Sequence, residues 1–333
     1  MISITPQFKK RYNINKNFII VCTQQLSEYS NSDHLPASGR IIILDLNKVK
    51  LSEIYSISLD EPLFTLHVHE QTIFVTSSCS LKAFQIQEEE DSNSAWKAIK
   101  LIEKSKKQYR HTIPIDTDYS EGKMLIGDLN MPLCLYEYSN GEISERAGSY
   151  LALYPRAVKI LENDEFMLSD SNEYLNIFGF KSKKGEDERH ILSVHDAIYL
   201  GSQCTKICEG TLTKQVPSKV LNIQNGKCII YGCASGEIGV LIPLQEAVYN
   251  QIRYLQDSIT EVFEQDGDFS SSPKPTYIKK SRTKCQFLDG RIIEKIRSLP
   301  EIKVNKIIAN INSPEPVNKK ELLSIIDRIA KLY

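Results

Sequence analysis

The fold is decided by a strand–turn–strand unit that reads Thr72-Ile73-Phe74-Val75-Thr76-Ser77-Ser78 and continues as Ser80-Leu81-Lys82-Ala83-Phe84-Gln85-Ile86. Both halves are short and rich in β-branched and aromatic residues, which is typical of paired strands. The same pattern recurs along the first three quarters of the chain. The further units are Phe18–Thr23 with Ile41–Leu46, Lys123–Asp128 with Leu133–Tyr136, Phe166–Asp170 with Leu175–Phe178, and Cys228–Gly232 with Ile238–Leu241.

These units recur at irregular intervals of about 40 to 60 residues, a period that suits propeller blades of four short strands better than helical solenoids. Their central strands are nearly continuous apolar runs, as expected where neighbouring blades cover both faces of a sheet. The sequence therefore predicts a mainly β fold, with about five strand-pair units of a partial β-propeller within residues 1–243.

Helical periodicity begins after Pro243. Apolar residues recur at helical spacing from Leu244 to Gln265, which predicts one long amphipathic helix. A short helix is expected at Arg291–Ser298, and Asn318 is a plausible cap for a last helix that continues to Leu332. We therefore expect residues 244–333 to form a small α-helical C-terminal domain.

The overall charge is nearly balanced, with 41 Lys and Arg against 42 Asp and Glu, which excludes a generally basic nucleic-acid protein. The eight cysteines lie mostly in apolar runs, as expected of buried thiols in a reducing compartment. Cys204, Cys208, Cys228 and Cys233 invite a zinc interpretation. We favour buried thiols, because strand geometry would put Cys204 and Cys208 on one face but Cys228 and Cys233 on opposite faces.

Other candidate sites also favour a non-catalytic interpretation. His67 and His69 share one face of a predicted strand but lack a third metal ligand, so we expect polar surface side chains. His190 and His195 are expected in a charged, solvated connection rather than in an acid–base pair. The spacing of Gly232, Gly236 and Gly239 is typical of a tight hairpin turn and not of a phosphate loop. We therefore expect neither an enzyme nor a bound cofactor or metal.

The segment from Pro273 to Arg297 carries a local charge of +6, with eight basic residues against Asp289 and Glu294. Such a segment is a candidate contact for phosphates or for an acidic partner, although a solvated loop is the simpler interpretation. The candidate contact residues are Lys279, Lys280, Arg282 and Lys284.

Several stretches, in their order along nearly the whole chain, resemble the C-terminal region of one protein family. That family comprises damaged-DNA-binding protein 1, the large subunit of cleavage and polyadenylation specificity factor, and splicing factor 3b subunit 3. The stretches include Gly39–Ile43, Asn172–Phe178, Tyr199–Gly201, Tyr231–Leu244 and Phe287–Gly290.

The resemblance implies blades of a seven-bladed propeller followed by helices, in a nuclear, non-catalytic scaffold. From the sequence itself we expect an intracellular protein that is nuclear and can also be cytoplasmic. The long helix is most similar to the branch that serves as adaptor of cullin-4 ubiquitin ligases and recruits propeller substrate receptors in DNA repair. On the receptor-binding face of that family, Tyr154 matches a central aromatic, while Gln203 and Thr205 replace a Phe and an Asn.

The alternative function is a scaffold subunit of a pre-mRNA 3′-end processing or splicing complex. In either case we expect protein partners within a larger complex and no membrane association. Direct DNA or RNA contact through the basic segment is a third hypothesis.

Overall fold

The computed structural model describes residues 2–5, 18–25, 38–46, 51–89, 98–108, 113–131, 133–181, 190–212, 227–265, 287–312 and 318–332. The chain divides into two compact units. The first comprises Met1–Ser171 and Phe178–Ser193, and the second comprises Asn172–Ile177 and Val194–Tyr333. Each unit is described by itself below.

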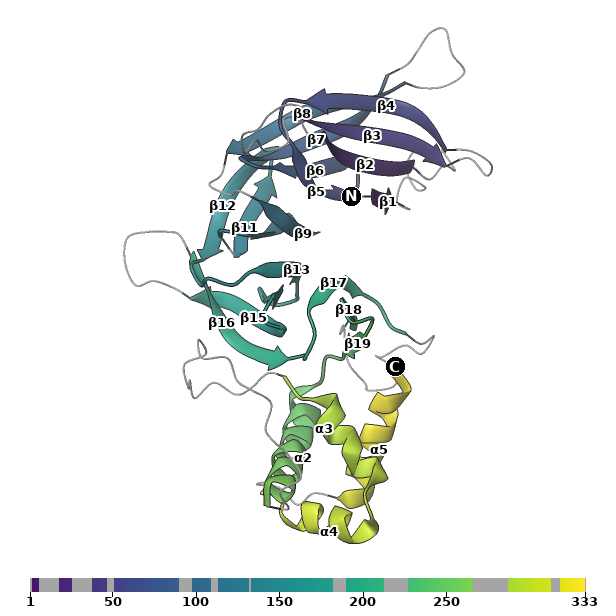
Figure 1. The fold of residues 1–333 in the computed structure, drawn as a ribbon, viewed down its shortest axis with the longest axis vertical. Helices are drawn as coiled ribbons and strands as arrows, with labels where there is room; N and C mark the ends of the chain where they lie inside the picture. The colour runs from purple at the N-terminus through teal and green to yellow at the C-terminus, as the bar shows by residue number, and fades with distance from the viewer. Residues whose placement is uncertain are drawn as a thin grey trace, which may run out of the picture. The chain divides into compact units, whose positions relative to one another are not determined.

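The described residues are mainly β, and most strands follow one another as antiparallel meanders (Figure 1). The first two meanders are separate four-stranded sheets. One contains β1 (Ile2–Thr5), β2 (Phe18–Gln25), β3 (Ser38–Leu46) and β4 (Leu51–Leu59). The other contains β5 (Leu63–His69), β6 (Thr72–Ser77), β7 (Ser80–Glu89) and β8 (Ala98–Gln108).

An eight-stranded sheet contains the next two meanders, joined where β12 pairs in parallel with β16 through Ala147 and His190. Its first half is β9 (Pro114–Ser120), β10 (Lys123–Asp128), β11 (Leu133–Ser139) and β12 (Glu142–Ser149). Its second half is β13 (Pro155–Ile160), β14 (Phe166–Asp170), β15 (Tyr174–Lys181) and β16 (His190–Tyr199). A three-stranded sheet follows, made of β17 (Cys204–Glu209), β18 (Ile229–Cys233) and β19 (Ile238–Leu241).

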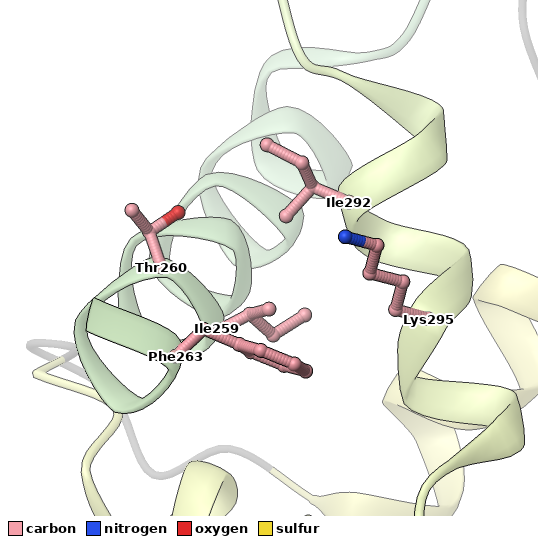
Figure 2. Close-up of a pocket in the computed structure, with 5 residues that line it drawn as sticks. All are labelled: Ile259, Thr260, Phe263, Ile292 and Lys295. Carbon is pink, nitrogen blue, oxygen red and sulfur yellow. The ribbon is translucent and has the colours of Figure 1, made fainter. Parts of the chain in front are cut away.

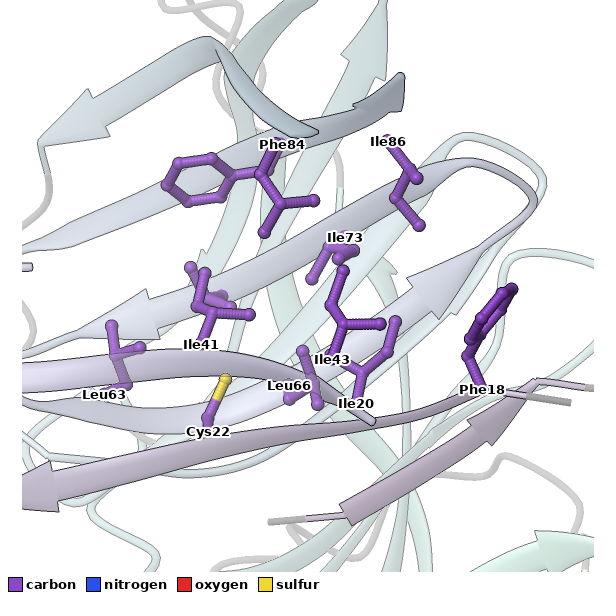
Figure 3. Close-up of a cluster of buried hydrophobic side chains, with 12 residues drawn as sticks. Phe18, Ile20, Cys22, Ile41, Ile43, Leu63, Leu66, Ile73, Phe84 and Ile86 are labelled. Carbon is purple, nitrogen blue, oxygen red and sulfur yellow. The ribbon is translucent and has the colours of Figure 1, made fainter. Parts of the chain in front are cut away.

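The structure confirms the predicted strand–turn–strand units, and burial explains their apolar sequences. Five of the six residues of β6 are buried, as is every residue of β14. One core of the first unit lies between the two four-stranded sheets (Figure 3). Ile20, Ile41 and Ile73 are fully buried in it, so it draws side chains from both sheets.

The helices belong to the second unit. They are α2 (Glu246–Gln265), α3 (Gly290–Glu294), η2 (Lys295–Ser298), α4 (Glu301–Ala309), α5 (Lys319–Ile329) and η3 (Ala330–Leu332). The predicted helix at Arg291–Ser298 is present as α3 followed by the 3₁₀ turn η2, and Asn318 caps α5 by accepting from Lys320 N at 3.0 Å. Helix α4 was missing from the sequence prediction.

A second core holds these helices together. Leu255 and Ile259 of α2 pack with Ile307 of α4 and Ile325 of α5, all nearly inaccessible to solvent. The Ser258 hydroxyl, also buried, donates to the Ile307 carbonyl at 2.6 Å, which joins α2 to α4. None of the described helices is long and apolar enough to cross a membrane.

Carboxylates join the neighbouring meanders of the first unit. Strands β9 and β13 each lie at an end of the eight-stranded sheet order, and the Asp116 carboxylate accepts from Val158 N at 3.1 Å. Asp118 accepts from Ile160 N at 2.8 Å and pairs with Lys159 Nζ at 3.0 Å. Both carboxylates are at most 8% exposed, so these bonds are shielded from water.

A polar cluster fixes the connection from β4 to β5. The Glu61 carboxylate accepts from Ser77 Oγ, from Ser80 Oγ at 2.7 Å and from Lys106 Nζ at 2.8 Å, and lies 3.3 Å from the buried Lys82 Nζ. Burial by itself raises the pKa of Glu61. The hydrogen bonds from Lys106, Ser77 and Ser80, with the charge of Lys82, outweigh burial and lower this pKa far below its usual range.

We predict that Asp116→Ala and Asp118→Ala each lower the free energy of unfolding by about 2 kcal/mol, because buried N–H groups of β13 lose charged acceptors. Asp116→Asn keeps an acceptor oxygen and is expected to cost less. Urea unfolding measures the change, and Glu142→Ala, exposed at the start of β12, is the control with an effect below about 0.5 kcal/mol. Equal effects of Asp116→Ala and Glu142→Ala would contradict the assignment.

Glu61→Gln is expected to lower the free energy of unfolding at pH 7 by about 3 kcal/mol, because it leaves the buried Lys82 without its anionic partner. The folded-state pKa of Glu61 lies below the unfolded value of about 4.3, so the stabilisation is complete above that pH. It is lost as the pH falls further towards the folded-state pKa.

Urea unfolding of wild type and variant between pH 7 and pH 3 measures this effect, and the gap between them is expected to narrow in acid. The control is Glu53→Gln, since the exposed pair of Glu53 with Arg40 at 3.4 Å contributes little. A gap that stays constant over the whole pH range would refute the role of Glu61.

Candidate partner-binding face

The loops that connect the strands lie at the two opposite ends of each meander. In an antiparallel meander the turn between the second and third strands lies at the same end as the connection into the next meander. In the first unit this end carries residues 129–131 after β10 and residues 150–154 before β13. A Cβ atom on Gly127 would lie 2.8 Å from Val158 Cγ1 and 3.1 Å from Pro155 Cβ, so the end of β10 packs directly against the start of β13.

The first strand of each of four meanders contains the same irregularity. The residue after the strand's first position is skipped in the pairing with the second strand, which is the mark of a β-bulge. The skipped residues are Phe64, Ile115, Arg156 and Thr205. A bulge at this position redirects the chain where it enters the strand.

A backbone hydrogen bond accompanies the bulge in three meanders. The residue after the second strand donates its N–H to the carbonyl of the residue before the first strand. The pairs are Leu129 to Ile113 at 3.1 Å, Ser171 to Tyr154 at 2.9 Å, and Ala234 to Gln203 at 2.8 Å. Tyr154 and Gln203 therefore occupy equivalent positions in successive meanders, and Thr205 is the bulge residue that follows Gln203.

Tyr154 points its side chain outward from a fixed backbone. It is 55% exposed, while its neighbours Leu153 and Pro155 are buried. Leu153 N donates to the Leu151 carbonyl at 2.8 Å, and Leu151 N approaches Ser149 Oγ at 3.3 Å. These hydrogen bonds restrain the main chain from residue 150 to residue 154, which carries the exposed side chain of Tyr154.

Two further residues of this end were missed by the sequence analysis. Tyr150 is 76% exposed on the same segment as Tyr154, and Leu129 is 38% exposed after β10. The signal for Tyr150 was its place four residues before Tyr154, in a segment that does not continue the strand pattern. Exposed aromatics of this kind supply large contact areas in protein interfaces.

Gln203 and Thr205, the two remaining candidate contact residues, lie in the second unit and form hydrogen bonds within it. Gln203 is half-buried, and its carbonyl accepts from Ala234. Thr205 is exposed, but its hydroxyl donates to the Gly232 carbonyl at 3.2 Å. Ser202 Oγ donates to Ser235 Oγ at 2.9 Å beside them, so the two loops at this end are cross-linked.

The cysteine prediction is wrong in part. Cys204 is buried and Cys208 is exposed, so the two do not share a face, because the bulge at Thr205 shifts the alternation of β17. Cys22, Cys134, Cys228 and Cys233 are buried as expected, and burial raises the pKa of the Cys22 thiol to about 12. Cys79 is exposed.

The histidine predictions have mixed outcomes. His67 and His69 lie in β5 with their rings 5.8 and 4.7 Å from the Tyr119 ring, in an aromatic cluster. His190 and His195 belong to β16 rather than to a loop, and the neighbouring Asp196 is buried and accepts from Phe287 N at 2.8 Å. Within the described ranges, no group of three or more His, Cys, Asp or Glu is arranged to hold a metal ion.

The glycine prediction is confirmed, because Gly236 has φ +88° in the turn between β18 and β19. The predicted basic contacts Lys279, Lys280, Arg282 and Lys284 lie outside the described residues. Of the same segment, Arg291 is described, and its guanidinium donates to the Leu200 and Tyr199 carbonyls, each at 3.2 Å. This arginine therefore has a structural role in attaching α3 to the end of β16.

Comparisons with known proteins agree with this architecture. The chain is 23% identical over 303 residues to DNA damage-binding protein 1a of Arabidopsis thaliana. It is 22% identical over 305 residues to DNA damage-binding protein 1 of Solanum lycopersicum, and 21% identical over the same length to the Oryza sativa protein of that name. Each alignment covers 90% of this chain but only 27% of the relative.

A family model described as the CPSF A subunit region matches residues 1–298, which include every described sheet, the helices α2 and α3, and the 3₁₀ turn η2. On this match, the chain belongs to the CPSF A subunit region family.

Proposed function

We propose that the chain is a non-catalytic β-propeller scaffold that presents one face to protein partners. Its meanders would be blades of a partial ring of the seven-bladed type, within residues 1–243, followed by a helical domain at 244–333. Four consecutive antiparallel meanders with four strands each support this arrangement. Membership of a family of scaffold subunits supports the absence of catalysis.

The role that fits best is that of an adaptor in a cullin-4 ubiquitin ligase. Its partners at this face would be propeller substrate receptors, which such an adaptor recruits in the nucleus. The relatives carry the name DNA damage-binding protein 1, which supports this branch of the family. The chain spans 27% of their length, so the proposal concerns receptor binding at this face and leaves cullin docking to other segments.

The observation that carries the proposal is the pair of exposed tyrosines, Tyr150 and Tyr154, on a segment held by backbone hydrogen bonds. Tyrosine loses little side-chain entropy on binding, and a main chain that is already ordered adds no further cost. The two rings, with the exposed Leu129 at the same end of the meanders, would supply apolar contact area, and the tyrosine hydroxyls would supply hydrogen bonds. Gln203 and Thr205 are proposed as further contacts in the second unit.

A scaffold subunit of a pre-mRNA processing complex is the second candidate. The description of the family model, which names the CPSF A subunit, favours it. Copurification distinguishes the two candidates, because a cullin with propeller receptors is expected in one case and endonuclease or spliceosomal subunits in the other.

We predict that Tyr150→Ala and Tyr154→Ala each remove the main copurifying partner, with a loss of about 2 kcal/mol or roughly 30-fold in affinity. Affinity purification of the tagged chain at low salt, followed by quantitative mass spectrometry, measures the loss. The control is Leu51→Ala, which removes an exposed apolar side chain from β4.

A partner that is retained by both tyrosine variants and lost with Leu51→Ala would place the interface elsewhere and refute the proposed face. If RNA-processing subunits copurify and depend on the same tyrosines, the proposed face stands and the complex is the pre-mRNA processing one.

The nucleic-acid hypothesis has a separate test. If the basic segment contacts phosphates, the triple substitution of Lys279, Lys280 and Arg282 by Ala weakens binding of a single-stranded oligonucleotide and flattens its salt dependence. Fluorescence anisotropy at several salt concentrations measures both. If the variant binds the oligonucleotide with the same affinity and the same salt dependence as the wild type, the nucleic-acid hypothesis is wrong.

A further inference from the structure

The helices of the second unit cover their apolar sides with one another. Figure 2 shows Ile259 and Phe263 of α2 and Ile292 of α3 on the facing sides of the two helices. Ile259 and Ile292 are 1% and 8% exposed, and both belong to the helical core. Between these helices the apolar residues are therefore already covered, and the first sheet of the first unit differs from them in this respect.

The first sheet, β1–β4, is apolar on both faces but buried on one. Along β2 and β3, buried residues alternate with half-buried or exposed ones, whereas β6 and β14 are buried almost throughout. Ile20, Ile41 and Ile43 lie on the buried face and belong to the core shown in Figure 3. Sheets that are apolar on both faces are normally covered on both. The second face of this sheet is therefore suited to a further contact.

The strand register assigns the residues of this second face, here called the open face. Ile19 pairs with Leu44 and Val21 pairs with Ile42, and all four are half-buried. Cross-strand partners lie on the same side of a sheet, so these residues form two adjacent apolar rows. Leu51 of β4, in register two positions beyond Leu44, is 51% exposed on the same side.

The open face carries no net charge in β2, β3 and β4. Its charged residues are Arg40 of β3 and Glu53 of β4, whose side chains lie 3.4 Å apart. Ser56 Oγ joins them, since it accepts from Arg40 at 2.9 Å and donates to Glu53 at 2.6 Å. Asp45 follows Ile43 by two residues on the buried face and is 5% exposed. Two copies of the open face can therefore approach each other without repulsion between like charges.

The size of the open face suits a weak pairing. Strands β2 and β3 contain eight and nine residues. Strands of this length extend about 27 to 30 Å, and four of them, about 4.8 Å apart, cover roughly 400 Å² in projection. Side chains that stand above the sheet raise the accessible surface beyond this value. Two such faces together bury close to the ~1,000 Å² that the smallest specific interfaces require.

We propose that the open face of β1–β4 binds the same face of a second copy of this chain, in a symmetric dimer. The two sheets pack face to face about a twofold axis, and their β-branched side chains interdigitate as in a β-sandwich. Neighbouring sheets within one chain already pack through such side chains in the core of Figure 3. The contact includes neither Tyr150 nor Tyr154, so the dimer does not depend on the proposed function.

Sedimentation equilibrium of the purified full chain tests the proposal. The average mass is expected to rise from 37.9 kDa towards twice that value as the concentration increases from about 1 to about 100 µM. Val21→Thr/Ile42→Thr keeps the β-branched shape but removes apolar contact, so the dissociation constant is expected to rise at least tenfold. The control is Ile102→Thr/Ile238→Thr, which changes a half-buried residue of β8 and an exposed residue of β19 and leaves the dimer unchanged.

Glu53→Lys tests the same face from an exposed position, where the fold is expected to be unaffected. The change gives each open face two positive charges, so the dissociation constant rises at low ionic strength. It returns towards the wild-type value in about 1 M salt, which screens the repulsion. The control is Glu142→Lys, which makes the same change of charge at the exposed start of β12. Circular dichroism checks the fold of every variant, and Glu53→Lys decides alone if Val21→Thr/Ile42→Thr unfolds.

A chain that remains a monomer at about 100 µM would overturn the proposal. A dimer whose dissociation constant is unchanged by both open-face variants would place the contact elsewhere and overturn it as well. Masses that rise beyond two copies would indicate a head-to-tail contact in place of the twofold one, and the proposed dimer would then be wrong.

Discussion

The N–H groups of Val158 and Ile160 face away from their own sheet, because β13 lies at its edge and pairs only with β14. The N–H groups on the unpaired side of a buried edge strand must find acceptors other than a paired strand. Asp116 and Asp118 supply them from β9, and their spacing of two residues matches that of the two donors. One pair of carboxylates therefore fixes the meander β9–β12 against the meander β13–β16, and with it the loops at their ends.

The candidate face inherits its geometry from this register. Val158 is held by Asp116, the bulge at Arg156 redirects the strand entry, and Tyr154 precedes both. The carbonyl of Tyr154 is then fixed by Ser171 N, so the segment is restrained on either side of its exposed ring. Partner binding at such a segment would cost little conformational entropy, which supports the proposal that the two tyrosines form the centre of an interface.

Sequence patterns predicted the paired strands well, because apolar runs covered on both faces leave a strong local signal. They failed where the decisive partner is distant in sequence. The sequence predicted a charged loop around His195, because the neighbouring Asp196 was expected to be solvated. The Asp196 carboxylate is instead buried and accepts a hydrogen bond from Phe287 N. Cys208 was assigned to the face of Cys204 because a bulge cannot be read from period two. Tyr150 offered only the weak signal of a segment that does not continue the strand pattern, and α4 is too short for periodicity to stand out.

The residue before the first strand of three meanders uses its main chain, and not its side chain, for the repeated hydrogen bond. At the equivalent positions before β9, β13 and β17, the carbonyl group accepts the structural hydrogen bond, whatever side chain the residue carries. Those residues are Ile113, Tyr154 and Gln203, which are aliphatic, aromatic and amide in turn. Since this hydrogen bond uses the main chain alone, substitution of the side chain leaves it in place and changes what the loop presents. If the proposed scaffold function holds, single substitutions at these positions would change its partners without removing this hydrogen bond.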